Sequence, residues 1–102
     1  MDLTFNLDIP VTGNTNHVEA PAVNGAHVVV TGVQAILNGV TAFDVELAEL
    51  NGNTIYSGSA PFNVQFSGIP LADGAGLLVK ALNYDGSGTG HIRITGMYRT
   101  NA

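Results

Sequence analysis

Apolar and polar residues alternate over several short stretches of this chain, which is the period of a β-strand with one buried face. In residues 3–9 the apolar positions are Leu3, Phe5, Leu7 and Ile9, and one polar residue separates each from the next. The same alternation recurs farther along, in residues 40–50, 62–66 and 91–98. We therefore predict half-buried strands in all of these segments.

Two other segments are predicted to be strands with apolar side chains on both faces. Residues 26–37 contain three consecutive valines, Val28 to Val30, and residues 77–84 carry apolar side chains on both faces. Such strands lie in the middle of a sheet or at an interface between chains. Val28, Val30 and Leu78 are accordingly our candidates for residues that contact a partner.

The segment between the predicted strands of residues 3–9 and 26–37 has few apolar residues. Pro10 is predicted to end the first strand, and residues 11–25 are predicted to form a long loop or arm. Long loops are often functional, so we expect this arm to become ordered only when it docks on a partner.

Asn-Gly dipeptides are strong signals for tight hairpin turns. Asn38–Gly39 predicts that residues 26–37 and 40–50 form a hairpin, and Asn51–Gly52 predicts a second hairpin with residues 54–56. The glycine-rich residues 85–90 predict a last hairpin. A helix is the alternative for residues 42–50, which include good helix formers, but the period of two and the flanking turns favour a strand.

Short strands separated by glycine and proline turns predict one all-β domain over residues 1–102. Its fold class is an antiparallel β-sandwich, either immunoglobulin-like or jelly-roll, since the pattern leaves the order of the strands open.

The chain carries little charge for its size. Charged residues make up 11% of the 102 residues, against about 25% in typical soluble domains. The net charge is −5, and the fixed cations are Lys80, Arg93 and Arg99. We expect no nucleic-acid partner, and no apolar stretch is long enough to predict a membrane span. A surface with so few charges is expected to be buried in part against another chain.

Side chains that could carry chemistry do not fall into a catalytic or metal-binding pattern. No serine lies in a nucleophile-elbow motif, the three histidines lack metal-ligand spacing, and cysteine is absent. We therefore expect no catalytic residue, no metal, no cofactor and no enzyme activity. His91, Arg93 and Thr95 fall on one outward face and could bind an anion or a partner's carboxylate. Tyr56 and Tyr84 are the aromatic residues left free for a sugar.

The C-terminal part of the chain resembles small β-sandwich virion proteins of tailed bacteriophages. The resemblance covers about residues 60–100 and is carried by Leu71-Ala72-Asp73-Gly74 before a strand and by the segment from Gly90 to Arg99, GHIRITGMYR. It implies a capsid decoration (cement) protein that forms a homo-oligomer, often a trimer, on the major capsid protein. Such a protein is made in the host cytoplasm and resides in the virion. The alternatives are a tail-fibre or baseplate module, a carbohydrate-binding domain, or a small hydrolase.

Overall fold

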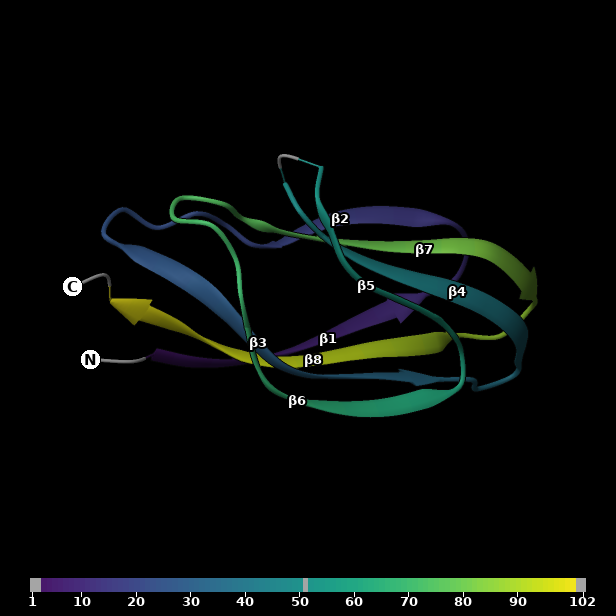
Figure 1. Ribbon diagram of the computed structural model, residues 1–102. Coiled ribbons are helices and arrows are strands. Elements are labelled where there is room, and N and C mark those ends of the chain that lie inside the picture. The colour runs from purple at the N-terminus through teal and green to yellow at the C-terminus, as the bar shows by residue number, and fades with distance from the viewer. Residues whose placement is uncertain (1–2, 51, 101–102) are drawn as a thin grey trace.

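The computed structural model describes residues 3–50 and 52–100, which form eight strands and, within these ranges, no helix. They stack as two antiparallel four-stranded sheets, so the predicted all-β sandwich is confirmed (Figure 1). In chain order the strands are β1 (Leu3–Val11), β2 (Thr15–Ala20), β3 (Ala26–Ile36), β4 (Val40–Glu49), β5 (Thr54–Ser59), β6 (Phe62–Pro70), β7 (Leu77–Gly86) and β8 (Gly90–Thr100).

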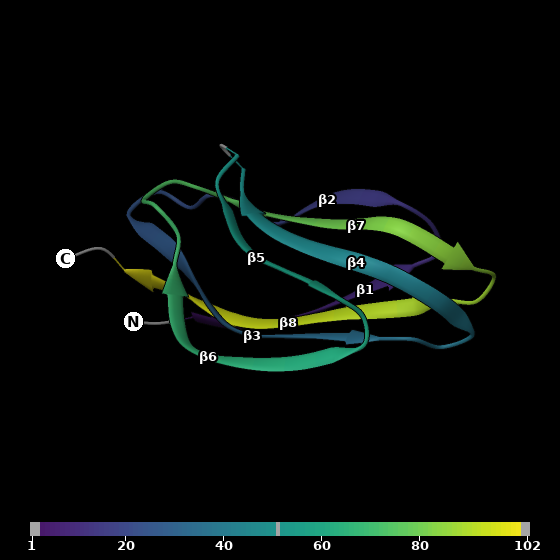
Figure 2. The same cartoon turned by 45° about the vertical axis from the view of Figure 1, so that its right-hand side comes forward.

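The order of the strands distinguishes between the two predicted sandwich types. One sheet has the order β1-β8-β3-β6 and the other β2-β7-β4-β5. The pairs β1–β8, β2–β7, β3–β6 and β4–β5 are therefore nested, as in an antiparallel ribbon wrapped around a core, which is the jelly-roll arrangement. Strand β1 begins and strand β8 ends at the same end of the sandwich, where Leu3 pairs with Tyr98 (Figure 2).

The core lies between the two sheets and is built by the inward residues of every second position. Leu47, Leu77, Ile92 and Ile94 are completely buried there. Burying side chains of this size contributes about 1.5–3 kcal/mol each. The alternation that predicted the strands thus arises from this core. Residues 42–50, for which a helix was the alternative, lie almost entirely in strand β4, so the prediction of a strand is confirmed.

Residues 11–25 do not form the long arm that the sequence predicted. Strand β2 occupies Thr15–Ala20 and pairs with β7. Because β2 lies at the edge of its sheet, it needs few apolar residues, and this is why its pattern was missed. Pro10 also fails to end the first strand, because β1 is an edge strand and continues to Val11; proline is tolerated at such edges.

Two of the three predicted hairpins are wrong. Asn38–Gly39 connects β3 to β4 and residues 87–89 connect β7 to β8, but the strands on either side belong to different sheets. Only the hairpin of β4 and β5 is confirmed, and Asn51 at its turn lies outside the described residues. A turn dipeptide indicates that the chain reverses its direction. It does not indicate which sheet the next strand joins.

Both segments with two apolar faces are central strands, as predicted. β3 lies between β8 and β6, and β7 lies between β2 and β4. β3 contains an irregularity between Val30 and Gly32 that shifts its register against both neighbours. No helix in the described ranges is long and apolar enough to cross a membrane.

Candidate functional site

The three predicted interface residues lie in different environments. Val28 and Val30 are 1% and 0% exposed and point into the core between the sheets, so they cannot contact a partner and this part of the prediction is wrong. A strand that is apolar on both faces does not reveal which face is inward. Leu78 lies between the inward residues Leu77 and Val79, and its side chain is on the outer face of the β2-β7-β4-β5 sheet.

Leu78 belongs to an apolar patch on that outer face. In the register it lies between Val18 of β2 and Ala48 of β4, and Leu50 follows two positions after Ala48. Val18 and Leu50 are each 52% exposed. We call Val18, Ala48, Leu50 and Leu78 the apolar patch.

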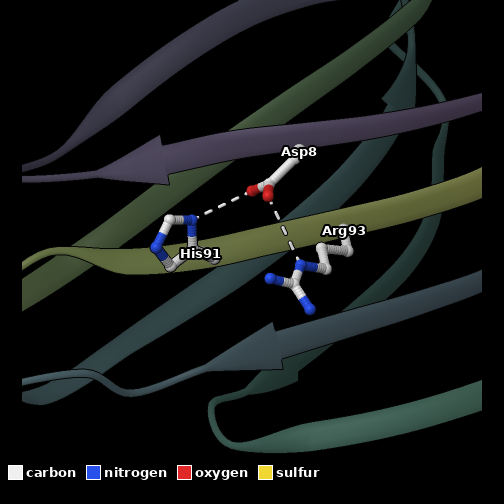
Figure 3. Close-up of polar contacts among 3 residues, drawn as sticks. All are labelled: Asp8, His91 and Arg93. Atoms are coloured by element: carbon white, nitrogen blue, oxygen red, sulfur yellow. Dashed lines mark hydrogen bonds and ion pairs between the residues drawn. The ribbon is translucent and has the colours of Figure 1, made fainter.

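The outer face of the opposite sheet carries a polar cluster around Asp8. Asp8 Oδ1 accepts a hydrogen bond from His91 Nδ1 at 2.9 Å, and Arg93 Nε lies 3.4 Å from Asp8 Oδ2 (Figure 3). β1 and β8 bring these residues together because Asp8 is directly opposite Arg93 in the register. The sequence indicated that this face could bind an anion or a partner's carboxylate, and the structure places the chain's own Asp8 against His91 and Arg93.

The environment of Asp8 favours its charged form. The hydrogen bond from His91, with smaller contributions from the positive charges of His91 and Arg93, holds the pKa of Asp8 below its ordinary value of 3.8. Arg93 uses Nε for this contact, and its two terminal nitrogens point away from Asp8 toward the β3 side (Figure 3). The guanidinium therefore retains donors for another group.

A band of polar side chains continues from Arg93 across the sheet. Arg93 pairs with Gln34 of β3, which pairs with Asn63 of β6. In the neighbouring row Thr95 pairs with Gly32, which pairs with Gln65. We call Gly32, Gln34, Asn63, Gln65, Arg93 and Thr95 the polar band.

A shallow hollow lies over Gly32 in the middle of this band, and all six residues of the band line it. Gly32 is buried, and a Cβ at this position would lie 2.9 Å from Thr95 Oγ1 and 3.0 Å from Gln65 Nε2, so these two side chains close over the glycine. The polar lining of the hollow therefore consists of hydroxyl, amide and guanidinium groups.

Two carboxylates on the outer face of the other sheet are already paired. Asp44 accepts hydrogen bonds from Ser59 Oγ at 2.7 Å and from Asn83 Nδ2 at 2.8 Å, and these contacts hold its pKa below 3.8. Glu46 accepts a hydrogen bond from Thr54 and faces Lys80 Nζ at 3.7 Å. These side chains surround the two carboxylates.

Other candidate groups are engaged in the fold. The Tyr56 ring packs edge-on against Phe62 and Phe66, and the Tyr84 hydroxyl donates to the Gly88 carbonyl, so neither tyrosine offers a free platform for a sugar. Among residues 3–50 and 52–100, no three His, Asp or Glu side chains gather in a group that could hold a metal ion.

No family model and no curated protein matches this chain. Its candidate sites therefore rest on the geometry of the two outer faces. The sequence indicated Leu78 and the face of His91, Arg93 and Thr95 but missed Asp8 and the amides of β3 and β6. Their outward positions follow from alternation, whereas their proximity follows from the pairing of strands that are distant in the sequence.

Proposed function

We propose that this protein is a non-enzymatic structural subunit that assembles through the apolar patch. The observation that carries the proposal is the exposure of Val18 and Leu50 near Leu78 on the outer face of one sheet. Side chains of this type on neighbouring strands gain free energy when a second surface removes them from water. In a chain with 11% charged residues, this face is suited to contact another protein.

The specific form of the proposal is a capsid decoration protein of a tailed bacteriophage. A homo-oligomer, such as a trimer, would sit on the major capsid protein and stabilise the shell of the virion. Its support is the resemblance of residues 60–100 to virion proteins and the jelly-roll architecture, which occurs in viral capsid domains. Since folds host many functions, the alternatives of a tail-fibre or baseplate module stay open to the same test.

Light scattering coupled to size exclusion, over a range of protein concentrations, tests the proposal. We expect the unmodified protein to form a closed oligomer and Leu78→Ser to shift it toward monomer. Leu3→Ser is the matched control, because Leu3 is an exposed leucine on the other sheet, and it should leave the oligomer intact.

Far-UV circular dichroism should give the same β-sheet spectrum for all three proteins. A monomer at every concentration would contradict self-assembly through this face. An oligomer that both variants weaken equally would contradict the assignment to the apolar patch. Co-sedimentation of the protein with assembled capsid shells would then distinguish a capsid protein from a tail component.

A further inference from the structure

We propose that the polar band on the outer face of the β1-β8-β3-β6 sheet binds a carboxylate-bearing sugar, such as a uronic-acid residue of an acidic polysaccharide. This site is separate from the apolar patch, which lies on the other sheet, so the proposal does not depend on assembly.

The first argument is unused hydrogen-bonding capacity. Within the described part of the chain, the side-chain amides of Gln34, Asn63 and Gln65 take part in no hydrogen bond or ion pair. The carboxylates Asp44 and Glu46 on the other sheet each have two partners. Thr95 Oγ1 shares a hydrogen bond with Thr31 Oγ1, whereas the three amides of the polar band remain available. Each amide offers both donors and an acceptor, which suits a ligand rich in hydroxyl groups.

The second argument is the position of the charge. Arg93 presents its terminal nitrogens to the band while Nε faces Asp8 Oδ2 at 3.4 Å (Figure 3). Two donors in one plane match the two oxygens of a carboxylate. Arg93 is also one of only three fixed cations in a chain of net charge −5. The rest of the molecule therefore offers few competing sites for an anionic group.

The third argument is the shape and composition of the surface. Gly32 is buried beneath the side chains of Thr95 and Gln65, because without a Cβ it lets the Thr95 hydroxyl and the Gln65 amide approach each other over the middle of the band. The rows of the polar band run across three strands, β8, β3 and β6, which is about 10 Å at the usual spacing of neighbouring strands, and this length suits a short oligosaccharide. The band contains no large apolar side chain, whereas the buried centre of a protein interface is mainly apolar.

Titration of the full chain with a uronic-acid trisaccharide, followed by amide and side-chain NMR shifts, tests the proposal. The neutral trisaccharide of the same linkage and acetate alone are titrated in parallel. We expect the acidic trisaccharide to shift the signals of the polar band, the neutral sugar to bind more weakly, and acetate to bind more weakly still. Binding should weaken as salt is raised.

Matched variants assign the binding to this face. Arg93→Gln is expected to weaken binding of the acidic trisaccharide by about tenfold or more, because it removes a charge-assisted pair of hydrogen bonds. Lys80→Gln removes the same charge from the other sheet and should leave the affinity unchanged. Gly32→Ala places a methyl group against Thr95 Oγ1 and Gln65 Nε2, which must then move, and should also weaken binding.

The thermal unfolding of each variant is measured first, so that a folding defect is recognised. Asn63→Ala, on the exposed edge strand β6, replaces any variant that fails to fold.

Equal weakening by Arg93→Gln and Lys80→Gln would overturn the proposal, because it would indicate attraction by charge alone. Shifts outside the polar band, equal binding of the neutral sugar, or no binding at all would also overturn it. The oligomer measured by light scattering should be the same in Arg93→Gln, so failure here is distinct from failure of the assembly proposal.

Discussion

The ring of Phe5 lies directly over the backbone of Gly96, its pairing partner on the adjacent strand β8. A Cβ at residue 96 would be 2.5 Å from Phe5 Cζ and 2.6 Å from the carbonyl oxygen of Val29. The same ring contacts that of Tyr98, with 5.6 Å between the ring centroids. The aromatic side chain thus fills the place that a side chain at position 96 would occupy.

Gly96→Ala should therefore destabilise the fold. One contact is with backbone, which cannot rotate away, so we expect a loss of about 1–3 kcal/mol, as for other overpacked cores. Urea unfolding followed by circular dichroism measures it. Gly13→Ala is the control, since no atom lies within 4 Å of a Cβ there, and it should change stability by less than about 0.5 kcal/mol. Equal stability of the two variants would contradict this packing.

Glu49 links the end of β4 to the loop between β6 and β7. Its side chain is 8% exposed, and Oε1 accepts a hydrogen bond from the Ala72 N–H at 3.1 Å, while Oε2 is buried with no partner in the described part of the chain. Glu49→Ala leaves the Ala72 N–H without its acceptor and should cost about 1–3 kcal/mol.

Glu49→Gln keeps an oxygen for Ala72 and removes a buried charge. It should retain most of the stability that Glu49→Ala loses, as measured by urea unfolding at pH 7. If Gln and Ala destabilise the protein equally, the hydrogen bond to the loop is not what Glu49 contributes.

Asn83 adopts a backbone conformation that ordinary residues avoid. Its φ is 53°, and its side chain donates to Asp44. Asn83→Ala loses the hydrogen bond and keeps the left-handed conformation, which costs about 1–2 kcal/mol for a residue with a Cβ. Asn83→Gly loses only the hydrogen bond and should be the more stable of the two in thermal unfolding. The reverse order would contradict this explanation.

Acid should weaken the fold through Asp8 and Asp44. Both have a folded-state pKa below the ordinary 3.8, so their contribution to stability is present above the unfolded-state pKa and is lost as the pH falls through the lower folded-state value. The double variant Asp8→Asn, Asp44→Asn should be less stable at pH 7 but lose less stability between about pH 5 and 2.

Urea unfolding at a series of pH values measures this difference, and NMR titration of the carboxyl carbons locates it. His91→Ala should move the pKa of Asp8 upward toward 3.8, because it removes the main hydrogen bond, and should leave that of Asp44 unchanged. A titration of Asp8 at or above 3.8 in the unmodified protein would contradict the cluster in Figure 3.

The sequence predicted individual strands better than their partners. Alternation located β1, β4, β6 and β8 because each has one face in the core. β2 was missed, since an edge strand with polar residues on both faces has little period to detect. The two false hairpins arose because short connections here join strands across the sandwich, and that choice depends on how the whole chain wraps.

The candidate sites show the same difference: the sequence indicated single residues but not which residues pair across strands. Leu78 could be assigned to an outer face only after Leu77 and Val79 were seen in the core. Val28 and Val30 were placed on the wrong face because the irregularity next to Thr31 and the double apolar faces of β3 conceal its phase. Asp8 and Arg93 are separated by most of the chain, so only the pairing of β1 with β8 brings them together.

The place of β8 between β1 and β3 has a consequence for biosynthesis. On the ribosome the chain emerges from its N-terminus, so the β2-β7-β4-β5 sheet can close before the last strand exists, whereas β1 has no neighbour until β8 has been made. During that interval β1 and β3 present unpaired edges, which are prone to aggregation. We expect nascent chains that stall before β8 to require a chaperone, and the complete protein to fold slowly because its pairings are long-range.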